Sequence, residues 1–338
     1  MRRLYRAPLS RWIFPALLPV VMLIPSTARA PAETITALAP VEVWADGFLD
    51  LRGIAVDADG RVFVADRQAG TVTRINNPNR KRTVVARGLA RPVGLAFDLT
   101  GHLLIAEERG RVVRLEGNSR RTTPLVTGVK QPRWLAMSES GTLYISARRL
   151  TRHADPEPEP DDDESVEPEM VLALSPSGHL AVFADGFRHL QGLALNHATL
   201  FAATKGRRGN RHAEGVVFQI PILADGRAGP ALAFGPTDEF KKPVGLVRDR
   251  LGALYLTTTE LDLKEDESKR AVGKLHPDGD VTLFAAHLKQ PQGLAFDPSG
   301  NLYVADGRRV LRFLAPAAPT VNAPPFTNQS PLAITGTT

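Results

Sequence analysis

Residues 291–306 read PQGLAFDPSGNLYVAD, and this stretch decides the fold because variants of it recur along the chain. The other five copies are LRGIAVDADGRVFVAD (51–66), PVGLAFDLTGHLLIAE (92–107), PRWLAMSESGTLYISA (132–147), LQGLALNHATLFAAT (190–204) and PVGLVRDRLGALYLTT (243–258). A unit of this length cannot bury its apolar faces alone, so successive copies have to stack against one another.

Each copy is predicted to contribute four short strands. An apolar strand is followed by a D-x-x-G turn and by a strand rich in aromatic and β-branched residues. A third strand has the pattern RVVRL (111–115), and a fourth has the pattern VTLFA (281–285). Short strands between Gly, Asp and Ser turns are typical of antiparallel hairpins. We interpret the D-x-x-G segments as turns, since a calcium loop needs further carboxylates at alternating positions.

The spacing of the copies predicts the architecture. The glycine of the phrase, replaced by Trp134 in the third copy, recurs at intervals of 41, 40, 58, 53 and 48 residues. A period of about 40 is that of a four-stranded propeller blade, and the longer intervals indicate insertions, chiefly between second and third strands. The last copy supplies only three strands, whereas VEVWADGF (41–48) has the pattern of VTLFAAHL (281–288). We therefore predict an all-β, six-bladed propeller over residues 41–314, closed by its N-terminal strand so that no sheet edge stays open.

The N-terminal 30 residues have the pattern of a signal peptide. Four arginines precede the apolar run 12–25, and Ala28-Arg29-Ala30 is a cleavage site of the A-x-A type. The run is short for a membrane span and contains prolines, which favours cleavage over a retained anchor. Removal of these residues, with their five arginines and no acid, lowers the formal net charge from +6 to +1. The high pI is therefore no argument for nucleic-acid binding, and we expect a monomeric periplasmic or secreted bacterial protein without disulfides, since cysteine is absent.

Two further segments differ in composition from the repeats. Residues 315–338 begin as a Pro/Ala-rich linker, and their end resembles the opening strand of bacterial immunoglobulin-like modules. Residues 155–169 carry nine acidic residues, no basic residue and several prolines. Such a segment cannot form a core. It is either a solvated loop, an internal counter-ion for basic loops or a weak calcium site.

In a propeller, the loops from fourth to first and from second to third strands share one face around the central channel. The position before each glycine of the phrase therefore lies at the channel mouth: Arg52, Val93, Arg133, Gln191, Val244 and Gln292. The loops add many Lys and Arg residues. Two interpretations stay open: a solvated, partly ion-paired rim, or a mouth for carboxylates, phosphates or acidic sugars anchored by Arg52 and Arg133. Trp134 either stacks on a ligand ring or narrows the channel.

The candidate ligand-binding residues are Arg52, Arg133, Trp134, Arg188, His189, Gln191 and Gln292. The eight histidines show no metal-ligand spacing, so no metal site is predicted. G-x-S-x-G is absent, and without cysteine there is no thiol nucleophile. The sequence names neither a catalytic residue nor a cofactor.

The repeated phrase resembles NHL repeats and the six-bladed propellers of the senescence marker protein/gluconolactonase type over about residues 41–314. For the lactonases, the resemblance implies a divalent metal held by Glu, Asn and Asp, several of them directly before the glycine. The matching positions here are Arg, Val, Arg, Gln, Val and Gln. A fainter likeness to virginiamycin B lyase-like and soluble quinoprotein dehydrogenase propellers adds a tricarboxylate quinone as a cofactor that would suit a basic mouth.

Two classes of function follow. The first is a binding or scaffold propeller with a basic channel face, whose partner is an anionic small molecule or a protein. The second is an enzyme, a hydrolase, lyase or quinoprotein-type oxidoreductase, acting on an anionic small molecule at the channel. The sequence leaves the choice between them open.

Overall fold

The structure is a computed structural model, and it describes residues 35–117, 120–150, 168–207, 213–237, 239–263 and 266–316. All of them belong to one compact unit that begins at Ile35. The predicted signal peptide, nearly all of the acidic segment and the end of the linker lie outside the described residues. Among the described residues, no helix is long and apolar enough to cross a membrane.

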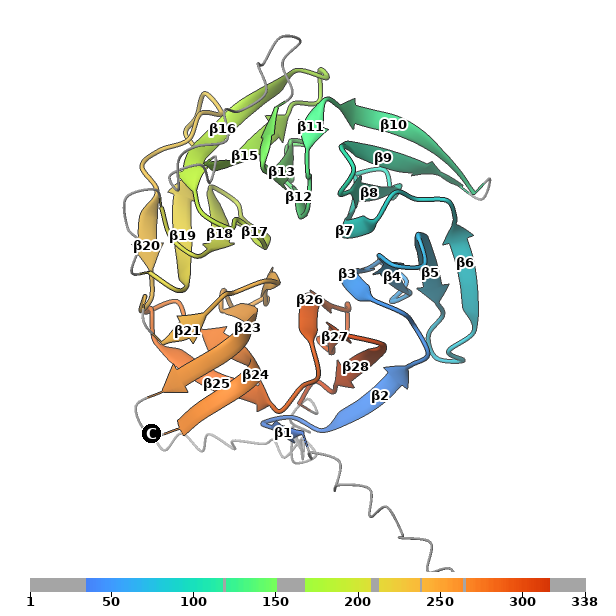
Figure 1. Cartoon of the computed structure of the whole chain (residues 1–338), viewed down its shortest axis with the longest axis vertical. Coiled ribbons are helices and arrows are strands. Elements are labelled where there is room, and N and C mark those ends of the chain that lie inside the picture. The colour runs from blue at the N-terminus through green and yellow to red at the C-terminus, as the bar shows by residue number, and fades with distance from the viewer. Residues whose placement is uncertain are drawn as a thin grey trace, which may run out of the picture. The chain divides into compact units, whose positions relative to one another are not determined.

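Within these ranges the strands form six antiparallel blades around a central axis (Figure 1). From the axis outward, blade one is β3 (Leu51–Val56), β4 (Val62–Asp66), β5 (Thr71–Ile75) and β6 (Arg82–Ala86). Blade two is β7 (Pro92–Phe97), β8 (Leu103–Glu107), β9 (Arg111–Glu116) and β10 (Arg121–Thr127). Blade three is β12 (Leu135–Met137), β13 (Leu143–Ala147), β15 (Glu169–Leu174) and β16 (Leu180–Phe187).

The second half of the ring repeats this order. Blade four is β17 (Leu193–Asn196), β18 (Thr199–Thr204), β19 (Val216–Pro221) and β20 (Leu232–Phe234). Blade five is β22 (Leu246–Arg248), β23 (Leu254–Leu263), β24 (Asp266–Leu275) and β25 (Val281–Ala286). Blade six is β26 (Pro291–Phe296), β27 (Leu302–Asp306), β28 (Arg309–Phe313) and the N-terminal β2 (Val41–Ala45).

The predicted ring closure is confirmed. Strand β2 pairs antiparallel with β28, with Val41 opposite Phe313. Trp44 of β2 is 3% exposed, and its ring meets that of Tyr303 edge to face at a centroid distance of 5.6 Å. Strand β2 thus completes blade six through both backbone pairing and core packing.

The hydrophobic core consists of six layers, each formed by residues of two neighbouring blades. Phe63 and Ala65 of blade one, for example, share a layer with Leu95 and Ile105 of blade two. Each blade therefore buries one face against the blade before it and the other against the blade after it, as expected of a repeat that cannot bury its apolar faces alone.

The glycine of the repeated phrase is required where the innermost strands converge. A Cβ atom at Gly53 would lie 1.9 Å from the carbonyl oxygen of Val93, and one at Gly94 would lie 2.1 Å from that of Arg133. The same contact continues around the ring with Gly245 and the carbonyl oxygen of Gln292, at 2.2 Å. Each glycine thus faces the backbone of the mouth position in the next blade. This contact fixes where the backbone of each mouth residue lies along the axis of the channel.

Small elements add to the six blades. β1 (Thr36–Ala37) extends the outer edge of blade five by pairing with β25, and β21 (Phe240–Lys241) pairs with β23. β11 (Val129–Lys130) and β14 (Arg149–Leu150) form a separate two-stranded ladder. In blade five, the extra residues between second and third strands lengthen β23 and β24 into a hairpin instead of forming a loop.

Candidate ligand site at the channel mouth

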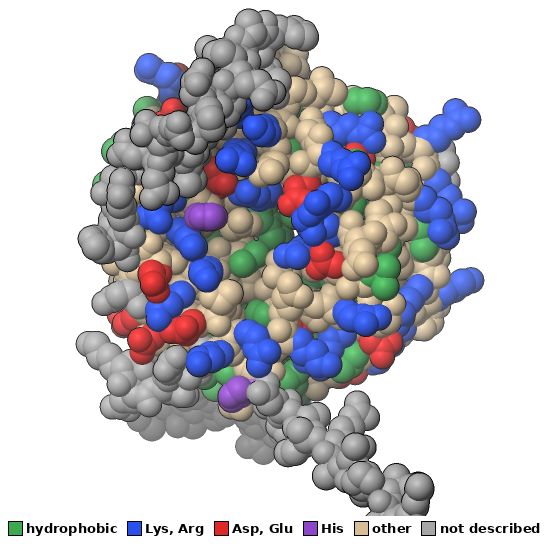
Figure 2. All heavy atoms as spheres, in the orientation of Figure 1, with side chains coloured by type: hydrophobic (Ala, Val, Ile, Leu, Met, Phe, Trp, Pro, Cys, Tyr) green, Lys and Arg blue, Asp and Glu red, His purple; other side chains and the backbone are tan. Residues whose placement is uncertain are grey.

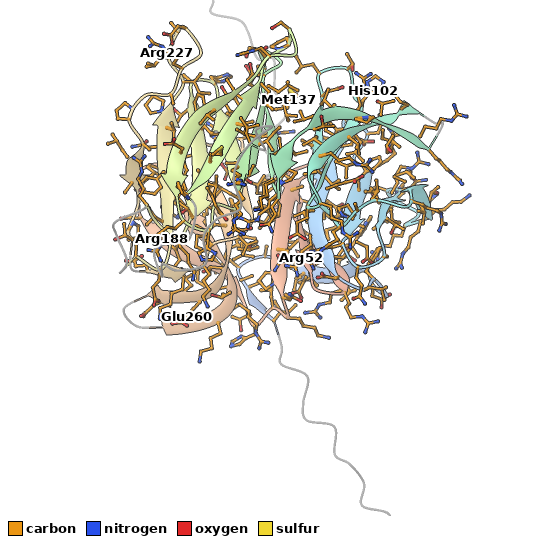
Figure 3. The ribbon with its side chains drawn as sticks, turned by 45° about the horizontal axis from the view of Figure 1, so that its top comes forward. Arg52, His102, Met137, Arg188, Arg227 and Glu260 are labelled. Atoms are coloured by element: carbon orange, nitrogen blue, oxygen red, sulfur yellow. The ribbon has the colours of Figure 1, made fainter. Side chains whose placement is uncertain are left out.

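The structure sorts the loops by face as the repeat predicts. Figure 3 shows Arg52, Arg188 and Glu260 toward one end of the ring and His102, Met137 and Arg227 toward the other. Arg188 precedes the first strand of blade four, and Glu260 lies in β23, beyond the stretch of that strand that pairs with β22. His102 lies in a turn between first and second strands. The mouth residues therefore share the face of Arg52.

Arg52 is held at the mouth by partners from two blades. Its Nη1 donates to Oε1 of Gln292 in blade six at 3.0 Å, and its Nη2 donates to Oδ2 of Asp50 at 3.3 Å. The side chain is 26% exposed. A guanidinium has five N–H donors, so donors remain for a ligand after these contacts.

A network of charges continues outward from Arg52. Asp50 also pairs with Arg67 at 3.4 Å, and Glu108 pairs with Arg67 at 2.9 Å and with Arg91 at 2.8 Å. Three arginines thus share two carboxylates, which leaves one positive charge in this part of the rim. The buried Asp66 forms no ion pair in this network; it accepts hydrogen bonds from the backbone N–H groups of residues 49, 50 and 69.

Arg133 has a carboxylate partner that the sequence did not suggest. Its Nη1 lies 2.8 Å from Oε1 of Glu169 and also donates to the carbonyl oxygen of Leu190 at 3.0 Å. Glu169 is 5% exposed, and its other oxygen accepts the backbone N–H of Leu190. Glu169 is the last residue of the acidic segment, and the composition of that segment does not predict a strand. In the structure it begins β15 and joins blades three and four at the mouth.

Trp134 is 9% exposed and packs with Leu190 and Leu193 in the layer between blades three and four. Its Nε1 donates to Oε1 of Gln191 at 3.3 Å. A buried indole offers little surface for stacking. The structure therefore favours the interpretation of Trp134 as a residue that narrows the mouth.

His189 lies in the loop before blade four, with a φ of +49°. Desolvation, and next the charge of Lys205, lower the pKa of its imidazole below the usual value of 6.5. Arg133 and Arg188 lower this pKa further, and Glu169 opposes them. The imidazole is therefore neutral at pH 7 although it stands in a cationic part of the rim.

The six mouth positions divide the ring into two halves. In blade order they are Arg52, Val93, Arg133, Gln191, Val244 and Gln292. The two arginines lie on either side of Val93, and the two glutamines lie on either side of Val244. Figure 2 shows Lys and Arg side chains gathered around the middle of this face, with a few Asp and Glu among them. The mouth positions of blades one to three thus include two cations, and those of blades four to six are uncharged.

The metal that the lactonase resemblance implies does not fit these residues. Among the described residues, no three His, Asp or Glu side chains group so that they could hold a metal ion. The mouth positions offer two guanidinium groups, which would repel a dication.

The ring has close counterparts among solved structures. A gluconolactonase from Xanthomonas campestris superimposes with a TM-score of 0.67 at 19% identity, covering 82% of this chain and 90% of its own. The fold is that of the gluconolactonase-like six-bladed propellers. The calcium-binding protein regucalcin from Agrobacterium tumefaciens gives a TM-score of 0.63 at 15% identity, covering 81% and 93%.

A third propeller, the PQQ-bound aldose sugar dehydrogenase from Streptomyces coelicolor, gives a TM-score of 0.57 at 17% identity and covers 83% of this chain and 98% of its own. No protein-family model and no curated protein match the sequence. At these identities the likeness is one of fold, and the predicted architecture is confirmed by it.

Proposed function

We propose that this propeller is an enzyme that binds a carboxylate-bearing small molecule at the channel mouth. The observation that carries the proposal is the pair Arg52 and Arg133, held on either side of Val93 in fixed positions while donors remain unused. Charge-assisted, bidentate hydrogen bonds to a carboxylate are the strongest contacts such groups make. The names of the structural neighbours, a gluconolactonase and a sugar dehydrogenase, support an enzyme acting on a sugar-derived molecule.

The two halves of the mouth orient such a ligand. Its carboxylate faces Arg52 and Arg133, and its hydroxyl or carbonyl oxygens face the amides of Gln191 and Gln292. An amide side chain both donates and accepts hydrogen bonds, which suits a polyol. A sugar acid has this division into one charged and one hydroxylated end.

His189 is the residue we assign to proton transfer. Because its pKa is lowered, the neutral imidazole is present at pH 7 and accepts a proton from water or from a carbon beside the carboxylate. Lys205 and Arg188 stabilise negative charge that develops on the ligand. The reaction class is hydrolysis or elimination.

A non-catalytic binding or scaffold module is the second candidate. The observation in its favour is that both arginines already have carboxylate partners, Asp50 and Glu169, as in a self-compensated rim. Binding without turnover on panels of lactones and sugar acids would select this candidate over the enzyme.

Binding is tested by calorimetry with D-gluconate and with D-sorbitol, a neutral polyol of the same carbon number. We expect gluconate to bind at least tenfold more tightly, and Arg52→Gln to remove that preference. Arg227→Gln, on the opposite face and in an exposed pair with Asp225, is the matched control and leaves binding unchanged. Equal binding of both polyols, or an unaffected Arg52→Gln variant, would overturn the proposal.

The direction in which the pKa of His189 is shifted gives a second test of the proposal. In the free protein we expect the NMR titration of the His189 imidazole to have its midpoint below 6.5, because desolvation and Lys205 disfavour the imidazolium. Bound gluconate introduces a negative charge, so it raises that midpoint, and Lys205→Met raises the midpoint of the free protein. Activity that depends on neutral His189 falls as the pH drops through the lowered pKa. If gluconate leaves the midpoint of the His189 titration unchanged, the anion binds away from His189.

We also propose that the protein is exported, on the composition of residues 1–30. Mass spectrometry of protein expressed with its full N-terminus in a bacterium is expected to find a mature chain that begins at Pro31. An intact N-terminus on the cytoplasmic protein would contradict export.

A further inference from the structure

A cleft between blades one and two opens on the face opposite the channel mouth. Its volume is about 340 Å³, and turns of both blades border it, including that of His102, which lies far from Arg52 in Figure 3. Phe63 of β4 and Phe97 of β7 line its apolar side, with their rings edge to face at a centroid distance of 5.2 Å. The cleft is distinct from the mouth.

Arg74 lines this cleft and has no acidic partner among the described residues. Arg74 of β5 lies directly across from Phe63 on β4 and from Thr83 on β6, so all three share one face of blade one. Its Nε is buried and has no hydrogen-bond partner. Among the described residues, no carboxylate pairs with its guanidinium. A buried donor without an acceptor is costly, which makes this position one that calls for an explanation.

The residues equivalent to Arg74 in the other blades provide a comparison. The residue at the same register of the third strand is basic in three other blades, and there each has an acid within 4 Å: Arg114 with Glu116 at 3.1 Å, Lys274 with Asp249 at 3.9 Å and Arg312 with Glu42 at 3.4 Å. Blade four has Gln219 at this register, opposite Phe201. Within the part of the chain that the structure describes, Arg74 is thus the cation of this register that lacks an acid.

The other charges of the cleft leave it positive. Arg61 pairs with Asp57 at 2.6 Å and with Asp59 at 2.7 Å, so these three groups carry one net negative charge, and Arg74 and Arg120 bring the sum to +1. Arg120 stands exposed at the rim and forms no ion pair with a described residue. The uncompensated positive charge therefore lies at Arg74 and Arg120, beside an aromatic wall.

We propose that this cleft is a second ligand site, for a small aromatic carboxylate. The carboxylate pairs with the guanidinium of Arg74, taking the place that Glu116, Asp249 and Glu42 have in other blades. The ring of the ligand packs against Phe63 and Phe97, where aromatic pairs prefer edge-to-face or offset contact. The volume of the cleft is at the small end of the range for ligand sites, which suits a single ring.

The test uses 4-fluorobenzoate as the probe, observed by ¹⁹F NMR, and 4-fluorobenzyl alcohol as its neutral counterpart. We expect the carboxylate to bind at least tenfold more tightly than the alcohol. Arg74→Gln copies the residue of blade four, so it is expected to fold, and it should weaken 4-fluorobenzoate binding at least tenfold. Its melting temperature, measured alongside, separates loss of binding from loss of structure.

Two matched variants locate the probe. Arg114→Gln removes an ion-paired arginine at the same register and should leave the affinity within about twofold. Arg52→Gln tests the channel mouth and should also leave the affinity unchanged. If Arg52→Gln abolishes binding while Arg74→Gln does not, the probe occupies the mouth and the cleft is no site. Absence of binding at millimolar probe would equally overturn the proposal.

Discussion

At position 53 a single methyl group would meet the carbonyl oxygen of Val93 at 1.9 Å, and backbone on both sides prevents either blade from yielding. We expect Gly53→Ala to lower the free energy of unfolding by about 3 kcal/mol or more, since overpacking a rigid contact costs that much. For a propeller of this size a loss of 3 kcal/mol lowers the melting temperature by roughly 5 °C.

Gly273 provides the matched control for this substitution. It lies in β24, and a Cβ atom there would be 3.7 Å from its nearest neighbours, an ordinary contact. Gly273→Ala should therefore leave stability unchanged or raise it by up to about 1 kcal/mol through the lower entropy of the unfolded chain. Equal effects at both positions would mean that the innermost strands are not in close contact.

The pair of Arg133 and Glu169 predicts strong coupling at the mouth. Glu169 is 5% exposed, so Arg133→Met leaves a buried carboxylate without its partner and should cost about 3–5 kcal/mol. In the double variant Arg133→Met/Glu169→Gln, the charge is gone and the amide can still accept the N–H of Leu190. Denaturant unfolding of the parent protein, of the single variants Arg133→Met and Glu169→Gln and of the double variant should give a coupling energy of about 1–3 kcal/mol between the two positions. Additive effects would show that the pair is not formed.

The mouth arginines could be predicted from sequence, but their partners could not. The register of the repeated phrase places Arg52 and Arg133 directly before the glycine position, and the glycine contacts keep them there. Asp50 lies in an irregular loop before β3, where no period predicts a direction for the side chain. Glu169 lies 36 positions after Arg133 in the sequence, behind an insertion that separates them. Pairing across such an insertion depends on the closed blade and leaves no local pattern.

At the scale of elements, strand β2 carries the closure of the ring. A chain that begins at Gly47 lacks β2 and with it Trp44, whose ring also lies 4.7 Å from the guanidinium carbon of Arg312. Loss of a buried tryptophan alone costs about 3–5 kcal/mol, and the exposed edge of β28 adds to it. We expect this truncation to lower the free energy of unfolding by more than about 5 kcal/mol, measured by thermal and denaturant unfolding.

A chain that begins at Pro40 is the control for the truncation. It loses β1, which pairs with β25 through two residues only, but keeps β2. Its stability should lie within about 1 kcal/mol of that of the longer chain, because a two-residue edge strand buries little. Comparable losses in both truncations would mean that β1, and not β2, holds the N-terminus.

The elements outside the repeat were those that the sequence did not predict. The phrase contains short apolar runs bounded by turn residues, so first and second strands followed from it. β1 and the pair β11 and β14 are two residues long, too short for any period to be read. The mostly polar sequence TTTELDLKEDESKRA (257–271) indicates an insertion between second and third strands and does not predict the hairpin of β23 and β24. Leu261 and Ala271 of this stretch are buried in the core between blades four and five, but two apolar residues among so many polar ones do not distinguish a strand pair from a loop.

At the scale of the whole molecule, the ring is closed by strands from the two ends of the propeller that pair within one blade. Any other blade should be able to contain the chain ends in the same way. The backbone N–H of Leu314 donates to the carbonyl oxygen of Pro40 at 2.9 Å, so the two ends of the propeller meet. A short linker can therefore join residue 314 to residue 40, and new ends can be opened elsewhere. Exposed turns are the positions that tolerate such a cut.

Two circular permutants separate closure within a blade from closure between blades. One opens between Pro176 and Ser177, in the turn between β15 and β16, so β16 becomes the N-terminal strand that completes blade three. The other opens between Arg188 and His189, so every blade is contiguous in sequence, and blades three and four are joined by side-chain packing and a few loop hydrogen bonds without a strand ladder. Against the parent chain 40–314, we expect the first permutant to lose about 1 kcal/mol at most and the second about 3 kcal/mol or more. The physical reason is that the ladder of β15 and β16 bridges the first cut. No such ladder bridges the second cut, where side-chain packing is joined only by the few backbone hydrogen bonds of Phe187 and Arg188 with residues 205–207. Equal stabilities would show that packing between blades suffices to close the ring.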